Sequence, residues 1–105
     1  AFSVRIVKLY KYLNSEKNEF IISKQIIRSG TSIGANIREA KYAHSKADFI
    51  ARLQIALKEA NETGYWLELL YRTQYIGEEE YKTLDSACTS IRVMLIASIN
   101  TAKSN

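Results

Sequence analysis

The stretch Arg28-Ser-Gly-Thr-Ser-Ile-Gly-Ala-Asn-Ile-Arg-Glu-Ala40 decides how the chain folds, because it holds two glycines and few bulky side chains. Two interpretations are open. The Ser-Gly-Thr-Ser segment could be a loop, since glycine inside a helix costs about 1 kcal/mol relative to alanine. Alternatively, one helix runs through it, and the small residues let a neighbouring helix approach closely. The second interpretation is favoured, because the inward-facing line keeps its three-and-four spacing across the stretch: Ile22, Ile26, Ser29, Ile33, Ile37 and Ala40.

The same periodicity predicts three further helices, so we expect helices over about 2–14, 19–43, 46–75 and 78–101. Asn18 is a favourable N-cap for the second helix, with Glu19 in its first turn. Ser45 and Asp48 form a capping-box pattern ahead of the third helix. Gly77 and three glutamates mark the start of the fourth. The predicted fold is all-α, a single antiparallel up-down-up-down four-helix bundle over residues 1–105.

Composition excludes several classes of protein. The 105 residues contain no proline and four glycines, too few turn residues for a β-rich fold. The single cysteine, Cys88, excludes an internal disulfide and a cysteine-based zinc site, and it favours a reducing, cytoplasmic setting. No apolar run approaches the roughly 18 residues that span a bilayer, and no secretory leader is visible. One histidine cannot supply the paired ligands of a bundle metal site, so no metal or cofactor is expected.

Positive charge is concentrated in the first half of the chain. Residues 1–47 hold nine lysines and arginines against three acids, whereas residues 48–105 hold six against eight, which together give the net charge of +4. A basic surface of this kind favours an anionic partner, RNA or DNA, although it is also consistent with a solvated basic face. The candidate nucleic-acid-binding residues are Arg5, Lys8, Lys11, Lys24, Arg28, Arg38 and Lys41. No base-reading module is present, so contacts to the backbone are expected.

More apolar residues are present than the core stripes of one bundle require. Trp66, Leu69, Val93 and Ile96 fall outside those stripes, and large exposed apolar surfaces usually mark an interface. We expect these four residues to join copies of the chain in a homo-oligomer. A protein-interaction scaffold that binds a different partner through the same residues, with no role in nucleic-acid binding, is the alternative.

A ribbon of polar residues follows the second predicted helix. Arg28, Ser32, Asn36 and Glu39 are spaced by four, four and three residues, and Glu59 and Glu62 lie three apart in the third helix. One interpretation is that these groups are solvated and contribute little to stability. The other is a buried network in which Arg28 and Asn36 meet Glu59 or Glu62 and fix the helix register. Neither interpretation makes them catalytic.

The segment from Gln25 through Arg28–Ala40 resembles the signature of a bacterial four-helix-bundle family. That family is associated with proteins encoded in intervening sequences of 23S ribosomal RNA genes. The third helix extends the resemblance through Asp48-Phe-Ile50, Leu53-Gln-Ile-Ala56, Glu62, Tyr65-Trp-Leu-Glu-Leu-Leu70 and Tyr75-Ile76. The specific likeness covers residues 20–76, and the Ser-Ile-x-Ala-Asn-Ile core is not a generic helix sequence.

The resemblance implies an antiparallel bundle that assembles into a ring, typically a homopentamer. A relative in diversity-generating retroelements is similar and binds nucleic acid and its reverse transcriptase, which makes a nucleic-acid enzyme a possible partner here. The family's recurrent polar positions match Arg28, Ser32, Asn36, Glu39 and Glu62. Many members have proline where this chain has Gly34, and Glu-Gly where it has Glu39-Ala40. Because of these departures, the resemblance does not decide which subgroup of the family shares its partners with this chain.

An enzymatic alternative rests on the spacing of Arg38 and His44. An Arg-x5-His spacing resembles the active-site pattern of HEPN-type ribonucleases, in which the histidine acts as acid or base and the arginine holds a phosphate. His44 directly precedes the Ser45 cap, however, and no polar residue of the type expected in that pattern follows Arg38. The sequence therefore predicts an accessory protein and no enzyme, which binds nucleic acid as a homo-oligomer without base-specific readout.

Overall fold

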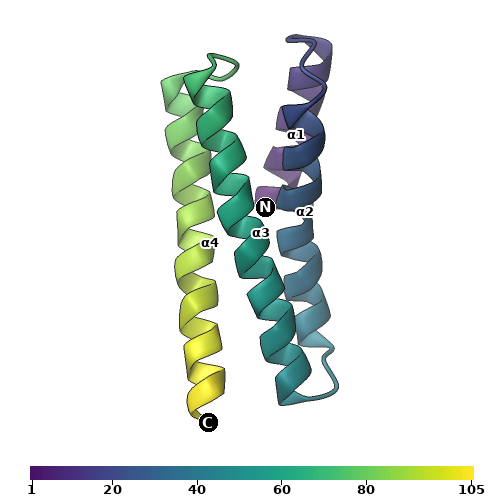
Figure 1. Ribbon diagram of the computed structural model, residues 1–105, viewed down its shortest axis with the longest axis vertical. Helices are drawn as coiled ribbons and strands as arrows, with labels where there is room; N and C mark the ends of the chain where they lie inside the picture. Colours follow the sequence, from purple (N-terminus) through teal and green to yellow (C-terminus); the bar gives the residue numbers. More distant parts are fainter.

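The computed structural model describes residues 1–105 and consists of four helices joined by short connections. These are α1 (Phe2–Ser15), α2 (Ile22–Lys41), α3 (Lys46–Arg72) and α4 (Glu78–Ser104). Successive helices run in opposite directions along a molecule of 47 × 21 × 19 Å, which confirms the predicted all-α bundle (Figure 1). At 1.5 Å per residue, the 14 residues of α1 cover only about half the length of α4, which has 27.

The small-residue stretch lies within α2 and is continuous helix, as its periodicity predicts. A Cβ atom added to Gly30 would lie 2.8 Å from Cγ2 of Ile6, and one added to Gly34 would lie 2.9 Å from Oγ of Ser3. Both contacts are with α1. The two glycines therefore let α1 pack against α2 more closely than any side chain would permit.

The core is divided along the length of the molecule. A larger cluster contains the buried apolar face of α1 (Ile6, Leu9 and Leu13) together with residues of the other three helices. Beyond the N-terminal end of α1, a smaller cluster of α2, α3 and α4 continues the core through Ala40, Leu53, Ala56, Leu95 and Ile99. The buried positions follow the three-and-four lines of the sequence, so these apolar stripes account for the fold.

The start of α2 differs from the prediction. Asn18 has a φ of 52° and forms part of the turn, so the predicted N-cap at this residue is wrong. The buried carboxylate of Glu19 satisfies the helix end instead, by accepting hydrogen bonds from the N–H groups of Ile21, Ile22 and Ser23 at 3.1, 2.9 and 2.7 Å. The helix consequently begins at Ile22, three residues later than expected.

The other helix ends are also set by local backbone bonds. The third helix stops at Arg72 and not at 75, because Gln74 adopts a φ of 68° and the N–H of Tyr75 bonds to the carbonyl of Leu70 at 2.9 Å. This is a Schellman-type end, with glutamine in the position that glycine usually takes. The predicted Ser45 cap is confirmed, since its Oγ accepts from the N–H of Asp48 at 3.1 Å. The fourth helix extends to Ser104.

None of the four helices combines the length and the apolar character that crossing a membrane requires.

Candidate functional site

The basic half of the sequence forms one side of the molecule. Residues 1–47 contain α1, α2 and the connection to α3, and Figure 1 shows α1 and α2 on one side of the molecule, α4 on the other and α3 between them, beside α2 at its N-terminal end and beside α4 at its C-terminal end. Of the seven predicted nucleic-acid-binding residues, only Arg28 forms an ion pair. The other six have no carboxylate partner within 4 Å: Arg5, Lys8, Lys11, Lys24, Arg38 and Lys41. These six side chains are the ones left for an external anion.

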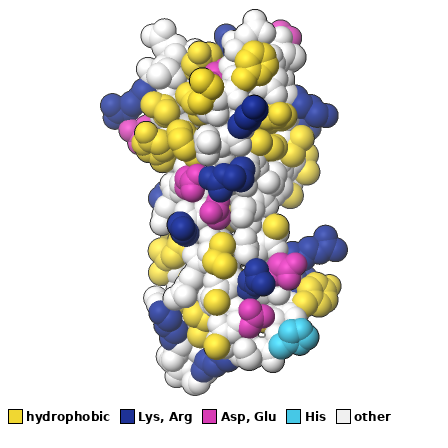
Figure 2. Space-filling view, turned by 45° about the vertical axis from the view of Figure 1, so that its right-hand side comes forward, with side chains coloured by type: hydrophobic (Ala, Val, Ile, Leu, Met, Phe, Trp, Pro, Cys, Tyr) yellow, Lys and Arg dark blue, Asp and Glu magenta, His cyan; other side chains and the backbone are white.

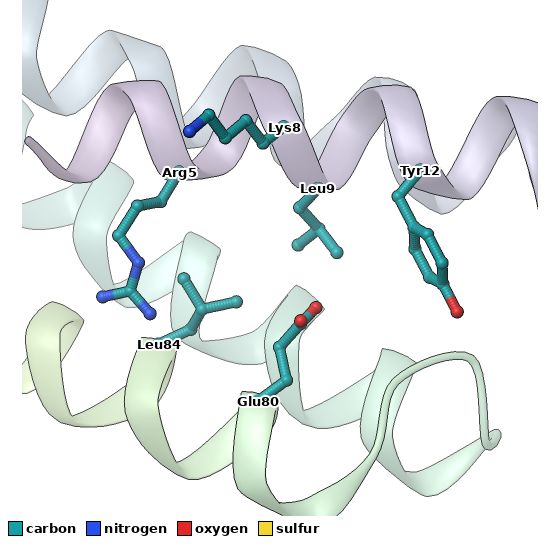
Figure 3. A pocket seen from close by; sticks show the side chains of 6 residues that line it. All are labelled: Arg5, Lys8, Leu9, Tyr12, Glu80 and Leu84. Carbon is teal, nitrogen blue, oxygen red and sulfur yellow. The ribbon is translucent and has the colours of Figure 1, made fainter.

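Two of these cations line an open groove between α1 and α4. The α1 wall carries Arg5, Lys8, Leu9 and Tyr12, and the α4 wall carries Glu80 and Leu84. Figure 3 shows Arg5 and Glu80 reaching toward each other's helices from opposite walls, with the two leucines between the helices. The side chain of Lys8 turns toward the Arg5 end, and Tyr12 lies at the other end. The groove has a volume of about 290 Å³.

Basic side chains do not form one continuous patch on the face that Figure 2 shows. Basic side chains there alternate with hydrophobic and acidic ones along the whole length of the molecule (Figure 2). Lys11, Lys24, Arg38 and Lys41 are exposed, but they line no groove.

Arg28 has a different role, because it connects α2 to α3. Its Nη1 donates to Oε2 of Glu59 at 3.1 Å, and its Nη2 bonds to Oε1 of Glu62. The same Glu62 oxygen accepts from Nε1 of Trp66 at 3.3 Å. Directly beneath, the buried hydroxyls of Ser29 and Thr63 hydrogen-bond at 2.9 Å. Arg28 is therefore engaged within the chain, in the polar network that was one of the two places where the sequence put it.

The predicted polar network is divided into two parts. Arg28 meets both glutamates, as one interpretation of the sequence expected, but the network is only partly buried, because Glu59 is buried whereas the Arg28 side chain remains 51% exposed. Asn36 does not reach α3: its Nδ2 bonds to the carbonyl and the hydroxyl of Ser32, one turn earlier in α2. Glu39 is exposed and forms no ion pair. This network therefore connects α2 to α3 at one level of the bundle only, the level of Arg28.

Removing the guanidinium tests the contribution of this connection to stability. We expect Arg28→Ala to lower the free energy of unfolding by about 1–2 kcal/mol, because Glu59 is nearly buried and loses its charged partner. The matched control is Arg72→Ala, which breaks an exposed pair with Glu68 within α3 and is expected to cost about 0.5 kcal/mol or less. Urea unfolding of both variants measures the difference, and equal losses would show that the Arg28 pair acts as an ordinary surface contact.

The predicted oligomer-interface residues differ in exposure. Val93 and Ile96 of α4 are exposed, whereas Trp66 and Leu69 of α3 are half-buried, and Trp66 packs against the core. The structure adds exposed apolar side chains that the sequence stripes did not single out: Phe20, Ile21, Ile55, Tyr65 and Met94. Ile21 is the most exposed of these residues, at 77%. It lies just before α2, where helical periodicity does not predict which side chains are exposed.

The residues considered for chemistry lie on the surface, away from the grooves. Arg38 and His44 are both exposed, and neither lines any of the three grooves. Three tyrosines lie among the basic residues of the first half of the chain: Tyr42 is 72% exposed, Tyr12, which lines the groove between α1 and α4, is 40% exposed, and Tyr10 is half-buried. No group of three or more potential metal ligands is present.

Cys88 is fully buried in the core beside α3, and its Sγ lies 3.3 Å from the carbonyl oxygen of Ala60. Burial raises the pKa of this thiol and so favours its unreactive neutral form. We expect an alkylating reagent to modify Cys88 at neutral pH only as fast as the protein unfolds, and to react at once in denaturant. Rapid modification of the native protein, followed by mass spectrometry, would contradict this placement.

The fold and these contacts define the class of protein: a small antiparallel four-helix bundle whose basic helix pair is tied to the acidic pair through an arginine and two glutamates. The chain belongs to the 23S rRNA-intervening sequence protein family, whose family model matches residues 1–97. It is also similar to the crystal structure of a protein of unknown function from the S23 ribosomal protein family of Bacteroides thetaiotaomicron. The two are 63% identical over 93% of this chain and 91% of that chain, with a TM-score of 0.92. A comparison with curated proteins found no match.

Proposed function

We propose that the protein is a cytoplasmic, homo-oligomeric accessory protein that binds RNA or DNA mainly through the phosphate backbone. The observation that carries this proposal is the set of six cations on α1 and α2 without a carboxylate partner. An unpaired lysine or arginine releases a counterion when it meets a phosphate, and this release supplies most of the sequence-independent affinity for nucleic acid. The description of the family concerns intervening sequences of ribosomal RNA, which makes RNA the first ligand to test.

Self-association strengthens the proposal. Exposed apolar side chains on α3 and α4, among them Val93 and Ile96, are suited to contacts between copies, and the family resemblance favours a ring of five. Because one chain carries a net charge of +4, five chains would carry a formal charge of +20. A polyanion that touches several subunits at once gains avidity without any new kind of contact.

Two measurements test the proposal. Light scattering should give a mass near five times the 12.0 kDa of one chain. Binding of fluorescently labelled RNA and DNA over a salt series should weaken steeply, with a linear relation between the logarithms of affinity and salt concentration. Binding that is equal at low and high salt would contradict the backbone mode. A monomer that binds no strand would favour the scaffold alternative.

A further inference from the structure

The groove between α1 and α4 holds charged groups that the chain itself leaves without partners. Arg5 and Lys8 on one wall and Glu80 on the other form no ion pair, although the walls face each other. Of the other two acids in the first turn of α4, Glu78 is paired with Lys82 at 3.1 Å, and Glu79 forms no ion pair but does not line the groove. Glu80 is thus distinguished from its neighbours because its carboxylate points into the groove (Figure 3).

These groups define the chemistry of a complementary ligand. Glu80 requires hydrogen-bond donors, because an ionised carboxylate only accepts. Arg5 and Lys8, at one end of the groove, suit a phosphate. Leu9, Leu84 and the ring of Tyr12 offer an apolar and aromatic lining for a flat group. The Nζ of Lys17 lies 5.9 Å from the centroid of the Tyr12 ring and adds positive charge at the other end. A ligand that is planar, donates hydrogen bonds from one edge and carries phosphate satisfies all three requirements.

We propose that this groove binds an unpaired guanine of a single-stranded nucleic acid, with the guanine base edge on Glu80 and a phosphate on Arg5 and Lys8. This inference rests on the proposed function. It adds the recognition of one base to binding that otherwise involves the phosphate backbone. The α1 wall belongs to the basic half of the molecule. The positive charge that attracts the strand therefore lies beside the groove.

Guanine is the base whose pairing edge fits a carboxylate. Its N1–H and N2–H₂ groups are adjacent donors, which can meet the two oxygens of Glu80 together. Adenine and cytosine each present a ring nitrogen acceptor beside their amino group, and uracil and thymine flank their single donor with two carbonyl oxygens. These acceptors would face the negative charge of Glu80. Unpaired bases are commonly recognised on this edge while they lie against aromatic side chains.

The size and openness of the groove suit one base of a longer strand. Its volume of about 290 Å³ is at the lower end of the ~300–1,000 Å³ typical of small-molecule sites. Because the groove is open to solvent along the surface, the sugar and the neighbouring phosphates can continue outward toward the other exposed cations of α1. An isolated nucleotide would lack those additional contacts, so a strand is expected to bind more tightly than the free nucleotide.

The test compares short labelled single strands that differ at one central position. One strand carries guanine there and contains no other guanine, the second carries adenine, and the third carries hypoxanthine, which lacks the 2-amino group. We expect the guanine strand to bind the full-length protein at least about fivefold more tightly than the adenine strand, the lower bound for a bidentate base contact. The hypoxanthine strand should lie between them. Parallel RNA and DNA series show which sugar the protein accepts.

The variant Glu80→Gln gives an outcome that a structural role for Glu80 does not predict. Removal of one negative charge should strengthen binding of the adenine strand, whereas the preference for guanine should fall to about twofold or less. The matched control is Glu79→Gln, which makes the same change one residue earlier in the first turn of α4, at a side chain that does not line the groove. It should strengthen binding of both strands equally and keep the preference.

The outcomes separate the two proposals. Salt-dependent binding without any guanine preference overturns the inference and leaves the proposed function standing. A guanine preference that survives in Glu80→Gln also overturns it, because the base is then read elsewhere. If no strand binds at any salt concentration, the proposed function fails and the inference fails with it. Loss of the preference in Glu80→Gln but not in Glu79→Gln supports the groove as the guanine site.

Discussion

Replacement of Gly30 with leucine is expected to lower the free energy of unfolding by about 3 kcal/mol, one of the two largest stability effects expected for a single exchange in this chain. The added Cβ alone would lie 2.8 Å from Cγ2 of Ile6, and Ile6 is fully buried between α1 and the other helices. Neither side chain can move aside, so α1 must shift away from α2. The gain of about 1 kcal/mol from removing a glycine within a helix offsets only part of this cost.

A matched pair of alanine variants isolates the close approach from helix propensity. Gly64 also lies within a helix, but a Cβ there would meet nothing within 4 Å. Gly64→Ala is therefore expected to stabilise the protein by about 0.5–1 kcal/mol, whereas Gly30→Ala should destabilise it. Chemical denaturation monitored by circular dichroism measures both. Equal stabilisation by the two variants would mean that α1 does not pack against Gly30 as described.

The contact can also be tested from its other side. Ile6→Ala removes the atoms that a new Cβ at position 30 would meet, at a cost of about 2–5 kcal/mol for the cavity it leaves. The double variant of Gly30→Ala with Ile6→Ala should then be less destabilised than the two single variants together. A coupling of about 1 kcal/mol or more is expected for residues in direct contact. Strict additivity would contradict the proximity of the two residues.

Neutralisation of the α1 cations is expected to produce the largest loss of nucleic-acid binding. The triple variant Arg5→Gln, Lys8→Gln, Lys11→Gln removes three exposed or half-exposed cations that have no carboxylate partner. Affinity for a single strand at low salt should fall by at least about tenfold, and the slope of log affinity against log salt should flatten by about two units. Fluorescence anisotropy with labelled strands over a salt series gives both quantities.

A triple variant with the same change in net charge distinguishes local contacts from overall charge. Lys58, Lys82 and Lys103 lie on α3 and α4, and their exchange for glutamine also lowers the net charge from +4 to +1. This control should leave the salt slope nearly unchanged and weaken binding only modestly. If both triple variants weaken binding equally, nucleic acid responds to the total charge of the protein, and α1 is not the contact surface.

The sequence predicted the local features of the fold well, because they depend on spacing along the chain. The phase of the apolar line through Ser29 and Ile33 was enough to predict a continuous α2, and the polar oxygen of Ser45 was enough to place the start of α3. The ends at Asn18 and Gln74 were not predicted. Both residues adopt a left-handed backbone without being glycine, and such a conformation leaves no mark in a hydrophobic pattern.

The candidate sites were predicted only as sets of residues. Seven basic positions could be named from the sequence, but the spacing did not show that Arg28 is engaged by Glu59 and Glu62 while the other six remain unpaired. Asn36 and Arg28 lie in one polar ribbon, yet Arg28 bonds to two glutamates of α3 whereas Asn36 bonds to Ser32 within α2. The reason is that a ribbon at helical spacing is wide, and small differences in angle around the helix axis decide which side chain meets the neighbouring helix.

By itself, then, the amino-acid sequence determined four helices, their apolar stripes and the concentration of positive charge in residues 1–47, because each of these is a property of local order or composition. Only the tertiary structure decided that Glu80 and Arg5 reach toward each other's helices across one groove, and that Gly30 meets Ile6. Such pairs join residues that are far apart in the chain. Their meeting depends on the rotation and register with which whole helices pack, and the entire set of core contacts fixes those together.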